Sequence, residues 1–111
     1  MNDKVDFWEI GDVERRRTGL GQAYLEFMRV PTMSAGVYVL PAGGKDGQSP
    51  HRQDELYYVV RGKSRMRAGG DDRCIAPGSI VFVAADVEHE FYAIEEELTL
   101  LVFFAPAETE A

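Results

Sequence analysis

The two histidines of this 111-residue chain are its most informative residues, because imidazole nitrogen binds divalent first-row transition metals. His51 is followed four residues later by Glu55, whose carboxylate is a second type of ligand for the same metals. Together with His89, these side chains can form a facial triad that leaves coordination positions open for water, dioxygen or a chelating substrate. We therefore expect His51, Glu55 and His89 to bind a metal. Gln53, which lies between the first two, is an additional candidate ligand.

The spacing of these residues suits β-strands, in which side chains i, i+2 and i+4 share one face. If the segment after position 50 is extended, one face carries His51, Gln53, Glu55, Tyr57 and Val59. In a later strand, His89 and Phe91 share a face. The three candidate ligands converge if these two strands lie side by side with those faces turned inward.

Glycine and proline punctuate the chain at short intervals from position 31 onward, and short β-branched and aromatic runs lie between them. This pattern is typical of an all-β sandwich or barrel made of two antiparallel sheets. We expect strands near 23–30, 35–40, 55–60, 63–68, 73–75, 80–83, 88–94 and 98–104. The sequence predicts one helix over 12–17, with Asp12 as its N-cap and Gly19 as its end.

The spacing of the candidate ligands and of two glycines resembles the cupin superfamily. Its first motif places a glutamate four residues after the second of two histidines and a glycine seven residues after the glutamate. His51, Glu55 and Gly62 match that spacing. The second motif runs from a Pro-Gly turn to a histidine eleven residues beyond the glycine, which Gly78 and His89 match.

This resemblance covers about residues 35–104, and it implies a small cupin-type double-stranded β-helix, or jelly-roll barrel, with a short N-terminal helix. We expect a single cupin domain over 1–111, with the core barrel at about 23–104 and an N-terminal extension at 1–22. The family's first histidine falls at Ser49. One more coordination position than in a four-ligand relative is therefore expected to be open or filled by water.

The resemblance also implies a cofactor and a type of function. The cofactor is a divalent transition metal, for which iron, manganese, zinc and nickel all stay open. The expected function is a metal-dependent enzyme of the dioxygenase, isomerase or lyase type that acts on a small polar organic molecule. The alternative is a non-catalytic small-molecule-binding or sensor cupin with a vestigial metal site. Candidate residues for the pocket wall are Tyr38, Tyr57, Phe82 and Phe91.

Composition limits the partners and the compartment. A net charge of −7 disfavours nucleic acid and anionic membranes, both of which attract basic surfaces. The amino end has no apolar stretch typical of a signal peptide, and the single cysteine, Cys74, excludes an internal disulfide, so we expect a cytoplasmic protein with a buried, inert thiol. Apolar strands near the amino and carboxyl ends, including 98–104, favour a homodimer.

Overall fold

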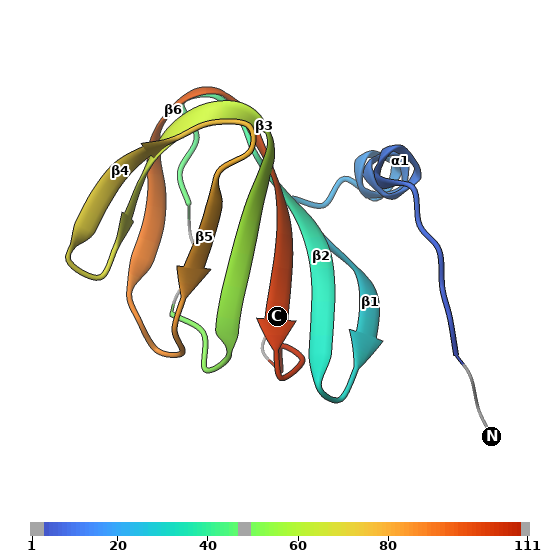
Figure 1. Ribbon diagram of the computed structural model, residues 1–111. Helices are drawn as coiled ribbons and strands as arrows, with labels where there is room; N and C mark the ends of the chain where they lie inside the picture. Colours follow the sequence, from blue (N-terminus) through green and yellow to red (C-terminus); the bar gives the residue numbers. More distant parts are fainter. Residues whose placement is uncertain (1–3, 47–49, 110–111) are drawn as a thin grey trace.

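The computed structural model describes residues 4–46 and 50–109 and confirms an all-β fold with one helix (Figure 1). The elements in chain order are α1 (Ile10–Leu20), β1 (Tyr24–Val30), β2 (Met33–Leu40), β3 (Asp54–Ala68), β4 (Asp71–Ile75), β5 (Ile80–Val83) and β6 (His89–Ala105). All strand pairs are antiparallel, in the order β1-β2-β6-β3-β4, and β5 pairs with β3. The described strands therefore form one continuous sheet rather than the two that the sequence suggests.

The two longest strands, β3 and β6, explain this difference. The sequence predicts a break in each of them, at 61–62 and at 95–97, but each strand continues through that place, where the pairs Arg61–Thr99 and Lys63–Glu96 still join β3 to β6. β3 turns at Gly62, whose φ is +101°, and the register with β6 shifts on both sides of this glycine. Glycine adopts a positive φ without the steric penalty of a side chain, so the strand bends instead of ending. Figure 1 shows both strands arching over the top of the molecule.

Strand alternation forms the core. Along the first half of β3, Glu55, Tyr57 and Val59 are buried, while Leu56 and Tyr58 between them are exposed. Tyr57 and Val59 join a core cluster that also contains Met66, Phe91, Leu98, Leu100 and Phe104. Burying a side chain such as leucine or phenylalanine contributes about 1.5–3 kcal/mol, so this cluster is the main source of stability.

Helix α1 is longer than the sequence predicts at both ends. It begins after Glu9 rather than at Asp12, which instead lies in the first turn, and no side chain caps its amino end. It runs past Gly19 and ends at Gly21, where φ is +66° and the backbone N–H contacts the last carbonyls of the helix. Val13 is its one buried residue, and it packs in a small cluster with residues of β1 and β2. The helix thus packs against β1 and β2 through Val13, and Figure 1 shows it beside the upper ends of these strands.

Two segments without regular secondary structure, one after β2 and one after β6, contact the strands. In the segment after β2, the Asp46 carboxylate accepts hydrogen bonds from the Tyr38 hydroxyl, at 3.0 Å, and from the Phe91 backbone N–H, at 3.1 Å. After β6, the chain passes through a cis Ala105–Pro106 bond and buries Ala107 and Glu108. In the described ranges, no helix is long and apolar enough to cross a membrane.

Cys74 differs from the prediction of a buried thiol. It lies on β4, the last strand in the sheet order, four of whose five residues are exposed, and it is itself exposed. Its sulfur accepts a hydrogen bond from the Arg65 guanidinium at 3.0 Å.

Candidate metal site

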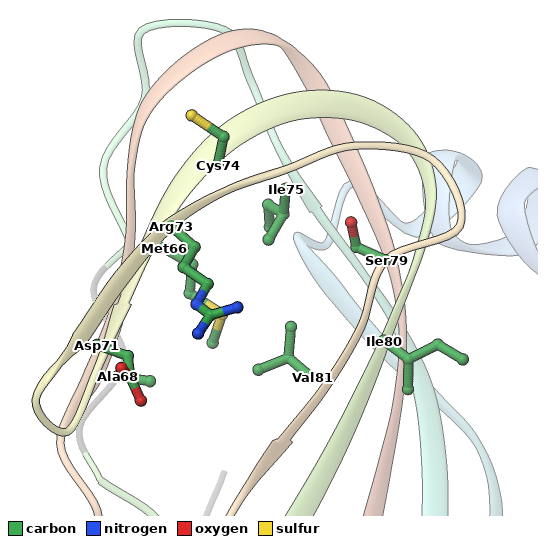
Figure 2. Close-up of a pocket in the computed structure, with 9 residues that line it drawn as sticks. All are labelled: Met66, Ala68, Asp71, Arg73, Cys74, Ile75, Ser79, Ile80 and Val81. Carbon is green, nitrogen blue, oxygen red and sulfur yellow. The ribbon is translucent and has the colours of Figure 1, made fainter.

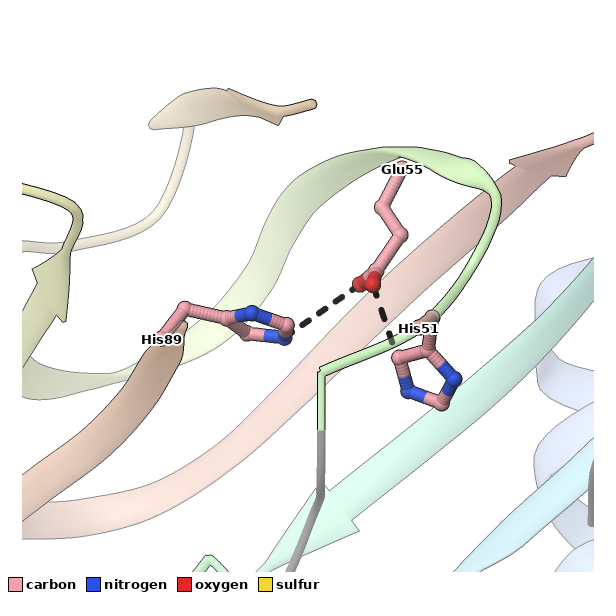
Figure 3. A group of neighbouring side chains, drawn as sticks. All are labelled: His51, Glu55 and His89. Atoms are coloured by element: carbon pink, nitrogen blue, oxygen red, sulfur yellow. Dashed lines mark ion pairs between the residues drawn. The ribbon is translucent and has the colours of Figure 1, made fainter. Parts of the chain in front are cut away.

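The structure brings His51, Glu55 and His89 together at one point inside the barrel (Figure 3). The Glu55 carboxylate lies between the two imidazoles: Oε1 is 3.9 Å from His51 Nε2, and Oε2 is 3.4 Å from His89 Nε2. One ligand atom from each residue lies within 4.8 Å of the other two. Ligands held about 2.1 Å from a common ion lie roughly 3.0–3.5 Å apart, so modest side-chain rotation closes this group around a metal.

The bend of β3 is what makes this convergence possible. His89 pairs in register with Ala68, which is thirteen residues after Glu55 on the same strand. In a straight strand thirteen residues span about 43 Å, far more than two side chains can reach across. Because β3 and β6 fold over together at Gly62, the two ligands meet across the interior.

Burial makes a cation favourable at this point. The side chains of Glu55 and His89 are 1% and 0% exposed, and that of His51 is 14% exposed. An ionised carboxylate in such surroundings is costly unless a cation or strong hydrogen-bond donors compensate its charge. The donor set of two nitrogens and one carboxylate suits a divalent first-row transition metal, so these residues fit the implied cofactor.

The ring nitrogens that face away from Glu55 have acceptors. His51 Nδ1 is 2.7 Å from Oε2 of Glu108, and His89 Nδ1 is 2.9 Å from the carbonyl oxygen of Val87. Each neutral ring donates its Nδ1–H to that acceptor and therefore turns the lone pair of Nε2 toward Glu55. Metal-binding histidines have this arrangement, because the outer acceptor sets both the tautomer and the orientation of the ring.

These contacts also alter the acidity of the histidines. The hydrogen bond with Glu108 raises the pKa of His51 above its ordinary value and outweighs the opposing effect of burial. For His89, burial is the largest single influence and lowers the pKa, but its contacts with Glu55 and with the Val87 carbonyl together raise the pKa overall. Protons would therefore compete with any metal that these two imidazoles bind.

Tyr57, a predicted wall residue, contacts two of the three candidate ligands. Its hydroxyl donates a short hydrogen bond to the Glu55 carboxylate and lies 3.0 Å from His89 Nε2. Its ring is fully buried and meets Phe91, another predicted wall residue, edge to face at 5.1 Å between ring centres. Tyr57 therefore lies directly next to the candidate ligands, and Phe91 packs against its ring.

The other predicted residues lie farther from the ligands. Gln53 is buried on the expected face, but its amide N–H donates to the Thr109 hydroxyl at 3.1 Å. Tyr38 lies in the same core cluster, and burial next to Asp46 raises the pKa of its hydroxyl. The structure does not bring Phe82 to the site: it pairs with the outward Leu56 and is 63% exposed. Ser49 lies outside the described residues.

Sequence reasoning did not identify Glu108 as part of this site. It follows the last strand by three residues and has no ligand-like spacing to either histidine. No local pattern marks it, because its contact with His51 joins segments 57 residues apart in the chain.

A separate hollow of about 290 Å³ lies between β3, β4 and β5 (Figure 2). Apolar side chains of Met66, Ile75 and Val81 line it together with the polar Arg73 and Ser79. None of the three candidate ligands is among its lining residues.

The fold, with the inward group of His51, Glu55 and His89, defines a β-barrel of the jelly-roll class with a candidate metal site, and comparison with known proteins names the family. Residues 36–105 match the family described as Cupin domain, and the chain belongs to that family. It is 42% identical over 102 residues to an uncharacterised protein of Streptomyces coelicolor, a match that covers 92% of this chain and 97% of the relative.

Two solved structures resemble this chain in fold although their sequences differ from it widely. TT1209 from Thermus thermophilus matches with a TM-score of 0.73 and 20% identity, over 93% of this chain and 99% of that one. The DMSP lyase DddQ from Ruegeria pomeroyi matches with a TM-score of 0.70 and 21% identity, over 75% of this chain. The match spans only 46% of the lyase, so the likeness concerns the fold of the barrel.

Proposed function

We propose that this cupin is a small metal-dependent enzyme in which His51, Glu55 and His89 hold one divalent transition metal. The observation that carries the proposal is the orientation of the two imidazoles. Each has an acceptor on Nδ1 and directs Nε2 toward the same buried carboxylate. Such pre-orientation is what a metal site requires of its histidines.

A metal bound by these three residues would supply Lewis-acid chemistry and open positions for a small chelating molecule such as a hydroxy acid or keto acid. The chain's own groups then set the surroundings. The Tyr57 hydroxyl holds a proton against Glu55 and orients its carboxylate. The ring of Phe104 packs edge to face against His51 at 5.0 Å between ring centres and excludes water from that side. These features suit a lyase, an isomerase or a dioxygenase.

One contact favours a second candidate, a non-catalytic cupin that binds a small molecule. The hydroxyl of Tyr57 satisfies the buried Glu55 carboxylate with a group from the protein itself. In that case the pocket would be a binding site in which the histidines are only hydrogen-bonding groups.

Metal binding separates the two candidates. Protein purified without added metal is analysed for its elements, stripped with a chelator, and titrated calorimetrically with Zn²⁺, Mn²⁺, Fe²⁺ and Ni²⁺. We expect one equivalent to bind, and we expect His89→Ala and Glu55→Gln to lower the affinity more than 100-fold, since loss of an outer-shell partner alone costs roughly 10–100-fold. Glu95→Gln removes an exposed carboxylate and serves as the control.

The result decides which candidate holds. Binding of metal together with turnover or dioxygen uptake on chelating acids supports the enzyme. Unchanged affinity in His89→Ala overturns the proposed ligand set, and a wild-type protein that binds no metal leaves the binding-module alternative.

We also propose that the protein is a cytoplasmic homodimer. The single cysteine is compatible with a reducing compartment. Four large apolar side chains lie together on the outer face of β3 and β5 as the cross-strand pairs Leu56–Phe82 and Tyr58–Ile80, each 39–66% exposed. Apolar patches of this kind support an interaction surface.

A further inference from the structure

The segment after β6 is held against the barrel by several independent contacts. The backbone N–H of Ala107 donates to the carbonyl of Pro31 at 3.3 Å, and that of Glu108 donates to the Ser34 hydroxyl at 3.0 Å. The Arg29 guanidinium donates to the carbonyl oxygen of Glu108. These contacts tie the segment to β1, to β2 and to the turn between them, so the position of Glu108 is set by the fold.

This anchoring directs the Glu108 side chain at one ring of the candidate metal site. Its Oε2 lies 2.7 Å from His51 Nδ1, and the side chain is only 10% exposed. A hydrogen bond of this length with a carboxylate is among the stronger ones in proteins, roughly twice as strong as a neutral one. Glu108 contacts the Nδ1 edge of the ring, whereas Glu55 faces Nε2, so Glu108 orients a ligand rather than joining the group of three.

We propose that Glu108 is a positioning residue of the metal site, and that the segment 106–109 is a working part of that site rather than a trailing end. Glu108 keeps the proton of neutral His51 on Nδ1 and presents the lone pair of Nε2 to the metal. This inference rests on the proposed function, since it assumes that His51 is a metal ligand.

Three variants separate positioning from a structural role. Glu108→Ala removes the acceptor. Glu108→Gln keeps the size of the side chain and a neutral acceptor but removes the charge. Glu95→Gln loses the same charge from an exposed position on β6 and is the matched control.

The first readout is the tautomer of His51 in metal-free protein, measured by long-range ¹H–¹⁵N NMR at an alkaline pH where both imidazoles are neutral. We expect the Nδ1–H form in the wild type and in the Glu95 control, retention of that form in Glu108→Gln, and a mixture with the Nε2–H form in Glu108→Ala. A contact that only anchored the chain end would leave the tautomer unchanged.

The second readout is Zn²⁺ affinity, measured by competition with a chromophoric chelator. We expect Glu108→Ala to bind Zn²⁺ roughly 10–100-fold more weakly than the control, with Glu108→Gln between the two. Wild-type tautomer or control-like affinity in Glu108→Ala overturns the proposal, and if that variant does not fold, control-like affinity in Glu108→Gln does the same. A wild-type protein that binds no Zn²⁺ contradicts the metal function, while the tautomer measurement still decides whether Glu108 holds His51.

Discussion

Replacing Gly62 with alanine tests whether the bend of β3 requires glycine at this position, as the structure indicates. At φ +101° an alanine is strained, and holding a non-glycine residue in such a region costs about 1–3 kcal/mol. An added Cβ would also overlap the carbonyl oxygen of Glu97 and lie 2.7 Å from Cα of Leu98. Both are backbone atoms of β6, so the sheet itself must shift, which adds about 1–3 kcal/mol.

The two costs together predict that Gly62→Ala loses about 2–6 kcal/mol of unfolding free energy. In a domain of this size each kcal/mol lowers Tm by about 4 °C, so the expected fall is roughly 8–24 °C. Metal affinity should fall as well, because the bend brings Glu55 opposite His89. Urea and thermal unfolding followed by circular dichroism measure the loss.

Gly70→Ala is the matched control for this substitution. Gly70 lies in the turn between β3 and β4, has no positive φ, and has no atom within 4 Å of an added Cβ, so its replacement should change stability by no more than about 0.5 kcal/mol. A loss below about 1 kcal/mol in Gly62→Ala, with an unchanged urea dependence, would refute the reasoning and mean that β3 can bend there without glycine.

Three further predictions concern protons and assembly. Because the pKa values of His51 and His89 are raised, metal affinity should weaken by about tenfold per pH unit for each imidazole as the pH falls below those values, starting above 6.5; a calorimetric titration series that is flat between pH 8 and 6 would contradict this. In metal-free protein the two histidines should have the opposite effect on stability. Their contribution to the free energy of unfolding should be fully present below about pH 6.5 and should be lost as the pH rises through their raised pKa values, which urea unfolding at each pH would test. Light scattering should report twice the monomer mass, and Phe82→Glu, on the exposed apolar patch of β3 and β5, should lower it; a wild-type monomer at micromolar concentration would remove the dimer proposal.

The sequence by itself determined the type of fold and which face of β3 turns inward. Short apolar runs between glycines and prolines predict antiparallel strands, and alternation along 51–59 places Glu55 and Tyr57 on the buried face, as the structure has them. These are local properties, since the period of a strand and the conformations open to glycine depend only on neighbouring residues.

The tertiary structure decided what depends on pairing between distant segments. Only the register of β5 against β3 shows that Phe82 shares the outer face with Leu56. Only the continuity of β3 and β6 through the bend brings Glu55 to His89, and only the anchored chain end brings Glu108 to His51. Residue types and spacing do not encode these contacts locally, because each depends on how the whole sheet folds over and buries its apolar face.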